Sequence, residues 1–205
     1  MSKYGYVGKE SDIPQQAFRA NAGVLSPNDI IDLSNNNKLT QYGQLELIET
    51  KTASNAASTV FTNLQDFNVH YVTISNAQNA GANSYLGIQF SSDGGSSYDT
   101  NNNYKRASVY GGNIGFGDGQ STGQALLPVT SDSATMKKNG HIYIYNAKNP
   151  LAYTFITTLH GEDNYPCNFL TGYHEVQQAT DAFRLKANND GNFSFTASLY
   201  GIRFA

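Results

Sequence analysis

The chain has 205 residues, a formal net charge of −3 and only 14% charged residues, compared with about 25% in an average soluble domain. It has neither the basic stripe of a nucleic-acid-binding protein nor an apolar run of about 18 residues, so we expect no nucleic-acid partner and no membrane span. Hydrophobic residues make up 39% of the chain, and its 14 Tyr and 11 Phe can fill the core of one β-rich domain with a terminal arm.

The first 42 residues predict an arm rather than part of a sheet. The stretch from Met1 to Ala22 follows neither the helical nor the strand period, yet it carries four large apolar or aromatic side chains, at Tyr4, Tyr6, Ile13 and Phe18. An arm of this kind has no core of its own. We therefore expect it to dock either on its own domain or on a partner, with these four residues as candidate contacts to that partner or to a second subunit.

One short helix is expected within the arm, over about residues 27–33. Ser26 can cap the helix, Pro27 suits the first helical position, and Asp29 places a carboxylate near free backbone N–H groups. The run of three Asn that begins at Asn35 is expected to follow the end of the helix.

Residues 43–205 predict a β-sandwich, because short runs of alternating apolar and polar side chains recur between turn residues. The clearest run places Phe193, Phe195, Ala197 and Leu199 on one face. No second segment has the helical period, which favours an all-β fold of two antiparallel sheets, with the jelly roll as the preferred topology. The expected strands cover residues 44–50, 59–61, 68–75, 84–91, 104–110, 125–130, 140–146, 151–160, 169–178, 182–186 and 192–203.

A turn motif follows the expected strand over residues 84–91. Ser91, Asp93, Gly95 and Ser97, followed by Tyr98, resemble the Asp-box, in which an aspartate accepts hydrogen bonds from the backbone of a β-hairpin. We interpret this motif as a structural turn. A calcium site that uses Asp93 and Asp99 stays open as an alternative, although the spacing lacks the oxygen-rich loop of an EF-hand.

The glycine-rich segment from Gly111 to Gly119 predicts a long surface loop. It does not resemble a phosphate-binding loop, because no helix is expected after it and no Gly-Lys-Ser/Thr sequence occurs. Ile114 and Phe116 within it are candidate subunit contacts. The segment from Lys137 to Gly140 predicts a turn.

The sequence favours a non-enzymatic protein that needs no cofactor and no metal. Its only cysteine, Cys167, rules out an intrachain disulfide and is expected to be a small buried residue. The four histidines, His70, His141, His160 and His174, lack the spacing of a zinc site. The only candidates for a glycosidase pair are Glu162, Asp163 and Glu175. His174 and Glu175 are adjacent on an expected strand and should therefore point to opposite faces.

Several tyrosines could instead form a sugar-binding surface. Tyr143 and Tyr145 share one strand face, while Tyr98, Tyr104 and Tyr110 flank two expected loops. Exposed aromatic rings of this kind can stack on sugar rings, although the absence of Trp disfavours this role. The alternative is that many of these tyrosines belong to the core or to an interface.

Three stretches together are similar to virion proteins of tailed bacteriophages, especially of marine and cyanobacterial phages. They are the leader from Ser11 to Asp29, the central segments from Phe61 to Asp99, and the closing segment from Leu199 to Arg203. The resemblance implies a virion component: a capsid decoration, or a head or tail appendage.

On this basis we expect an accessory structural protein of the virion, made in the host cytoplasm without a signal peptide. Its expected partners are other virion proteins, such as capsid or fibre proteins, and copies of itself. The alternative function is a receptor- or glycan-binding module of a tail or head fibre, which would engage host surface glycan.

Overall fold

The computed structural model describes residues 27–28, 31, 45–80, 84–112, 115–130, 137–161, 167–189 and 191–202. The chain divides into two units, Met1–Tyr42 and Gly43–Ala205, and the second unit contains all the strands. In the first unit the three described residues Pro27, Asn28 and Ile31 are helical, within the range expected for the short helix. None of the described helical residues belongs to a helix long and apolar enough to cross a membrane.

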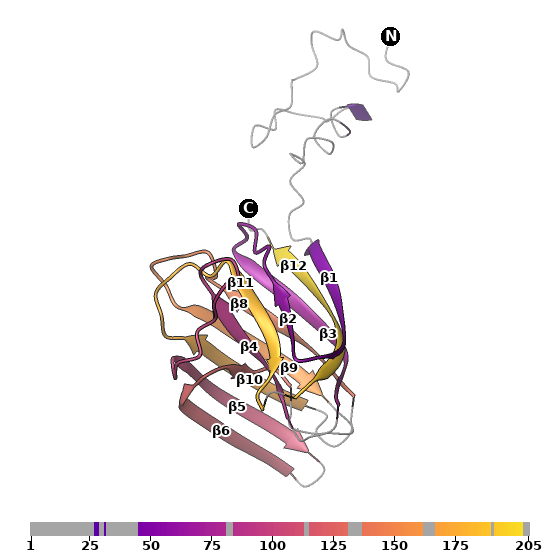
Figure 1. Cartoon of the computed structure of the whole chain (residues 1–205), viewed down its shortest axis with the longest axis vertical. Coiled ribbons are helices and arrows are strands. Elements are labelled where there is room, and N and C mark those ends of the chain that lie inside the picture. The colour runs from indigo at the N-terminus through magenta and orange to yellow at the C-terminus, as the bar shows by residue number, and fades with distance from the viewer. Residues whose placement is uncertain are drawn as a thin grey trace. The chain divides into compact units, whose positions relative to one another are not determined.

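The second unit is all-β, and its strands form two antiparallel sheets (Figure 1). The larger sheet has the order β1-β12-β3-β8-β9-β10-β5-β6, and the smaller has the order β2-β11-β4-β7. The predicted two-sheet antiparallel sandwich is thus confirmed. Its strands are β1 (Leu45–Ala56), β2 (Ser58–Phe61), β3 (Val69–Asn79), β4 (Leu86–Ser91), β5 (Tyr104–Gly112), β6 (Gly115–Gln124), β7 (Leu127–Pro128), β8 (Lys138–Tyr145), β9 (Thr154–Gly161), β10 (Cys167–His174), β11 (Ala182–Ala187) and β12 (Phe193–Ile202).

Eight of these strands have the topology of a jelly roll. The outermost strands in sequence pair with each other, β1 with β12 and β2 with β11, and the inner ones pair in the same nested way, β3 with β8 and β4 with β7. This nesting produces two four-stranded sheets, β1-β12-β3-β8 and β2-β11-β4-β7, as in a long hairpin rolled into a sandwich.

The other four strands extend only the larger sheet. The hairpin β5–β6 lies in sequence between β4 and β7, and the hairpin β9–β10 lies between β8 and β11. They continue the sheet beyond β8 in the order β9-β10-β5-β6, so that β6 forms the edge farthest from β1 (Figure 1). This extension enlarges the face of the larger sheet that points away from the core, hereafter called the outer face.

The core follows the period-two alternation of the strands. In β12 buried residues alternate strictly with half-buried ones, which confirms the predicted inward set Phe193, Phe195, Ala197 and Leu199. β4 is buried at all six of its positions, consistent with a strand covered on both sides. Across the smaller sheet, the rings of Phe61 and Phe183 stack at a centroid distance of 4.8 Å.

The predicted loop at the glycine-rich segment is wrong, because most of it lies in the hairpin β5–β6. Glycine has a low strand propensity, so the sequence pattern of β6 carries no strand signal. Pairing with β5 overrides this propensity, in a register that runs from Gly112 opposite Gly115 to Arg106 opposite Ser121. A Cβ at Gly117 would lie 2.6 Å from the exposed ring of Tyr110, so that ring would have to move if this position held a side chain.

The turn predicted from Lys137 to Gly140 is also wrong from Lys138 onward, because β8 begins at that residue. Lys138 is fully buried, and its ammonium group lies 5.8 Å from the centroid of the Phe193 ring. A lysine run beside Asn-Gly resembles turn chemistry in sequence, and only the pairing of β8 with β3 and β9 turns it into a strand.

Candidate functional site

The Asp-box-like motif after β4 is a turn whose hydrogen bonds are almost all local. The Asp93 carboxylate accepts from the Ser97 amide at 2.9 Å, the Ser97 hydroxyl at 2.6 Å and the Ser91 hydroxyl at 2.7 Å. The Ser91 oxygen in turn accepts from the amide of Gly95 at 3.0 Å. Gly95 has φ of +87°, which favours glycine at this position.

This arrangement uses both carboxylate oxygens of Asp93 within the turn. The hydroxyl and amide of Ser97, followed by the Ser91 hydroxyl, lower the pKa of Asp93 to about 2. Tyr98 lies beneath the guanidinium of Arg184, which is 4.2 Å from the ring centroid. The motif therefore orders the loop and leaves neither Asp93 nor the ring face under Arg184 free for a substrate.

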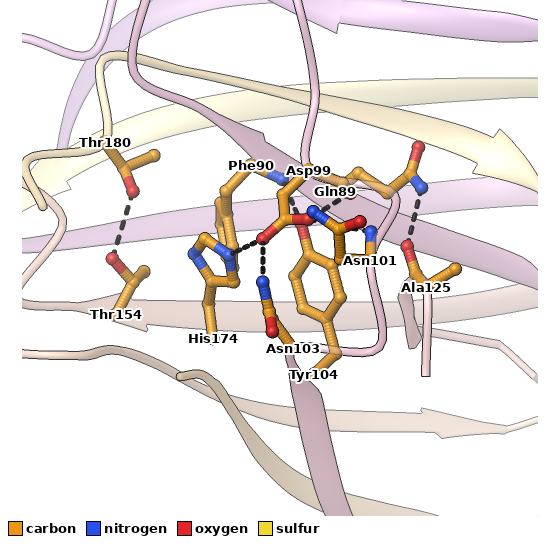
Figure 2. Close-up of polar contacts among 10 residues, drawn as sticks. All are labelled: Gln89, Phe90, Asp99, Asn101, Asn103, Tyr104, Ala125, Thr154, His174 and Thr180. Atoms are coloured by element: carbon orange, nitrogen blue, oxygen red, sulfur yellow. Dashed lines mark hydrogen bonds and ion pairs between the residues drawn. The ribbon is translucent and has the colours of Figure 1, made fainter. Parts of the chain in front are cut away.

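The buried His174 pairs with the half-buried Asp99, which joins β10 to the loop before β5 (Figure 2). His174 Nε2 lies 2.7 Å from Asp99 Oδ2, which also accepts from the side-chain amide of Asn103 at 2.8 Å. The imidazole is fully buried, and Tyr104 stacks on it at a centroid distance of 4.7 Å. The Tyr104 hydroxyl accepts from the Phe90 amide at 2.9 Å and so ties β4 to the same cluster.

An aspartate–histidine pair can support acid–base catalysis, but here the imidazole is enclosed by other side chains and offers no open face to a substrate. The rings of Phe90 and Tyr104 lie against the imidazole, and its Nδ1 is buried without a hydrogen-bond partner among the described residues. Burial alone would raise the pKa of Asp99, but the hydrogen bonds that its carboxylate makes with His174 and Asn103 hold this pKa below its usual value. The pair acts as a buried polar clamp.

Sequence reasoning missed this clamp because Asp99 and His174 are 75 residues apart and lie on separate elements. The two neighbours compared in the sequence, His174 and Glu175, do point to opposite faces. The Glu175 side chain instead forms an ion pair with Lys105 on the neighbouring strand β5, with 2.5 Å between Oε1 and Nζ. The other two glycosidase candidates, Glu162 and Asp163, lie outside the described residues. Among the residues that are described, no three His, Cys, Asp or Glu side chains gather closely enough to hold a metal ion.

The outer face carries a cluster of five aromatic rings over β12, β3 and β8, hereafter the tyrosine cluster. Tyr71 lies at its centre, with ring centroids 4.8 Å from Tyr143, 5.5 Å from His141 and 6.1 Å from Tyr200. Tyr143 also stacks on Tyr145 at 6.2 Å, as expected for two residues on one strand face. Burial, followed by the neighbouring phenol groups of Tyr143 and Tyr200, raises the pKa of Tyr71.

Next to this cluster, three exposed apolar side chains form a cross-strand row, hereafter the apolar row. Leu159, Phe169 and Val109 are register partners on β9, β10 and β5. They are 40%, 46% and 54% exposed, so roughly half of each side chain faces solvent on a sheet with no further layer among the described residues. The hydrophobic effect favours covering such a surface.

An open groove of about 520 Å³ lies on the outer face where the tyrosine cluster meets the apolar row. Its walls come from β3, β8 and β9 and from the first residue of β10. The groove is lined by aromatic rings, small polar side chains and one thiol, which include Tyr71, Thr73, Ser75, Asn139, His141 and Cys167.

One prediction about an individual residue, Cys167, is wrong, and Tyr104 follows the alternative that placed tyrosines in the core. Cys167 is exposed, whereas a buried position was expected; it starts β10 on the same face as Phe169 and therefore points outward. Tyr104 is fully buried and bonded to the Phe90 amide, so it is not part of an exposed aromatic surface, while Tyr110 is 38% exposed.

The predicted contacts to a particle or a second subunit cannot be placed by side chain among the described residues. Tyr4, Tyr6, Ile13, Phe18 and Ile114 lie outside the described residues, and Phe116 is described only as a backbone position in β6.

Comparison with known proteins gives no relative: no family model, curated protein or solved structure matches this chain.

Proposed function

We propose that the protein is a non-enzymatic accessory protein of a phage virion, a capsid decoration or a head or tail appendage. The observation that carries the proposal is the exposed apolar row of Leu159, Phe169 and Val109 across three neighbouring strands of the jelly roll. An apolar row on a flat sheet face favours contact with another protein, such as a copy of this chain or a neighbouring virion protein. Jelly rolls are also a common architecture of viral capsid domains.

The proposed attachment to the particle is through residues 1–42, which form a unit separate from the sandwich. The described residues of the sandwich form a hydrophobic core between its own two sheets. The aromatic residues Tyr4, Tyr6 and Phe18 within the arm supply the side chains that dominate protein interfaces.

The hydrogen bonds and ion pairs of the acidic side chains favour a structural over a catalytic role. Asp93 is saturated by its own turn and Asp99 by its clamp, while Glu175 is paired with Lys105. A catalytic group would need an open face toward a substrate.

Counting copies per particle by quantitative mass spectrometry tests this proposal. A decoration protein is expected in numbers close to those of a repeated lattice site, in the hundreds. A substitution of the apolar row, Phe169→Ser with Val109→Ser, should lower the copy number, whereas Leu151→Ser, at a residue that is 82% exposed, serves as a control elsewhere. Absence of the protein from purified particles would contradict the proposal.

A second candidate function is glycan recognition at the host surface. The observation that favours it is the position of the tyrosine cluster beside an open groove with polar walls. Carbohydrate-binding sandwiches combine aromatic rings with hydrogen-bonding side chains in this way, and jelly rolls also occur as lectin domains.

A further inference from the structure

We propose that the groove over β3, β8 and β9 is a binding site for an uncharged saccharide. This inference rests on the second candidate function and gives it a location and a class of ligand. It does not depend on attachment through the N-terminal arm, although Leu159 belongs to both the groove and the apolar row.

The aromatic wall of the groove supplies the apolar contact that a sugar ring needs. Tyr71 and His141 line the groove, and their ring centroids are 5.5 Å apart. Both rings are half-buried, so each leaves part of its surface open. The rings of Tyr143 and Tyr200 pack beside Tyr71, at centroid distances of 4.8 Å and 6.1 Å, and limit the rotamers that Tyr71 can adopt. A ring held in place loses little conformational entropy when a ligand binds.

Next to these rings, the same two strands, β3 and β8, supply hydrogen-bonding groups to the groove. Thr73 and Ser75 point outward from β3, because Val72 and Ile74, which alternate with them along the strand, face the core. Asn139 starts the wall on β8, and its Oδ1 accepts from the amide of Asn76 at 2.9 Å. That bond fixes the orientation of the Asn139 side chain and leaves its NH₂ group to donate to a ligand. The hydroxyl groups of Thr73 and Ser75 and the amide of Asn139 can each hydrogen-bond with the hydroxyl groups of a sugar.

The groove is also shaped to stay open. Gly161 is the register partner of Asn139 on β9, on the outward-facing parity of that strand. Because glycine has no side chain, the space between Asn139 and Cys167 is not filled from β9. A volume of about 520 Å³ lies within the range of about 300–1,000 Å³ that small-ligand sites occupy.

The charge of the groove selects the class of saccharide. Among the described residues that line it, none carries a carboxylate, an ammonium or a guanidinium group. His160 also borders the groove, but it belongs to the inward-facing residues of β9. A described lining without ionic groups offers nothing to offset the desolvation of a charged sugar, so we expect it to prefer neutral glycans over uronic acids or phosphorylated sugars.

Cys167 gives a direct test, because it is the only cysteine in the chain and lines this groove. The labelling rate of the full-length protein with a small thiol reagent should fall when a saccharide fills the groove. The probes are neutral malto-, cello-, xylo- and manno-oligosaccharides, with oligogalacturonate as the charged counterpart. At about ten times the dissociation constant of a binding sugar, occupancy of about 90% should slow labelling about tenfold.

Two variants and a control connect the protection to the groove. Gly161→Leu should fill the groove and His141→Ala should remove one ring, so each should abolish protection by the sugar. Thr171→Trp places bulk on the same sheet face, but at an exposed residue that does not line the groove, and should leave protection intact. The variants are compared after circular dichroism has established that each is folded.

Several outcomes would overturn the inference. One is that none of the neutral oligosaccharides protects Cys167. Another is that a sugar binds, as measured by calorimetry, without protecting the thiol; glycan recognition would then survive at a different site. Slower labelling at higher protein concentration without sugar would show that a second copy covers the groove. Equal protection by oligogalacturonate would contradict the preference for neutral sugars. None of these outcomes bears on whether the protein is found in virions.

Discussion

Lowering the pH from neutral to about 5.5 should destabilise the fold through two buried histidines, His70 and His160. They are only 0% and 4% exposed, and burial is the main cause that lowers the pKa of each from 6.5 to about 4. His70 keeps one hydrogen bond, from its Nε2 to the carbonyl of Gln65 at 3.1 Å. Neither ring nitrogen of His160 has a partner among the described residues.

The sign follows from the direction of these shifts. A histidine with a lowered pKa in the folded state binds its proton more readily when unfolded, so the free energy of unfolding falls as the pH drops below 6.5. For a shift from 6.5 to about 4, the change from pH 7 to about 5.5 costs about 1.2 kcal/mol per histidine, or about 2.5 kcal/mol for the pair. The lowered pKa values of Asp93 and Asp99 stabilise the fold above the ordinary carboxyl pKa of 3.8, so these groups add nothing in this window.

Urea denaturation at the two pH values measures this loss. The wild-type free energy of unfolding should fall by about 2.5 kcal/mol, and His160→Leu should lose only about half as much over the same pH change. The comparison is made within each variant, because the substitution itself alters the baseline stability. A wild-type stability that stays constant between the two pH values would refute the reasoning, as would an unchanged pH dependence in the variant.

Two further predictions concern single residues. Asp99→Ala should lower the free energy of unfolding by about 2–4 kcal/mol, because it leaves the buried His174 and the half-buried amide of Asn103 without their acceptor; Asp99→Asn, which keeps one oxygen, should cost less, and equal losses in urea titrations would contradict the clamp. Gly140→Ala should destabilise by about 1–3 kcal/mol, because its Cβ would lie 2.6 Å from the Leu159 carbonyl oxygen, whereas Gly123→Ala, with its nearest contact at 3.4 Å, should have a much smaller effect on the thermal midpoint.

The fold class was predictable because long strands of this sandwich bury one face. The alternation from Phe193 to Leu199 is a local pattern, and it is enough to indicate which side chains of β12 face inward. The nested pairing of β1 with β12 could not be predicted in the same way, because register partners such as Thr52 and Thr196 are far apart in the chain. The jelly roll was therefore preferred on fold class alone, and the structure supplies the strand order.

The missed features share a physical cause, which is that tertiary pairing overrides local pattern. β6 has four glycines and few large apolar residues, so only its partner β5 makes it a strand. Burial of Lys138 depends on neighbours on other strands, and so does the clamp between Asp99 and His174. The tyrosine cluster was half predictable: Tyr143 and Tyr145 alternate on one strand, but Tyr71 and Tyr200 join them only through sheet register.

The central claim, that the protein is a virion component held by its N-terminal arm, is tested most directly by particle incorporation of a truncated chain. Full-length protein and a variant lacking residues 1–21 would be produced during infection by the proposed parent phage, and purified particles would be assayed by quantitative mass spectrometry. The truncated sandwich should remain folded and be absent from the particles. Incorporation of the truncated protein at the full-length level would contradict the role of the arm, and absence of the full-length protein would contradict the assignment to the virion.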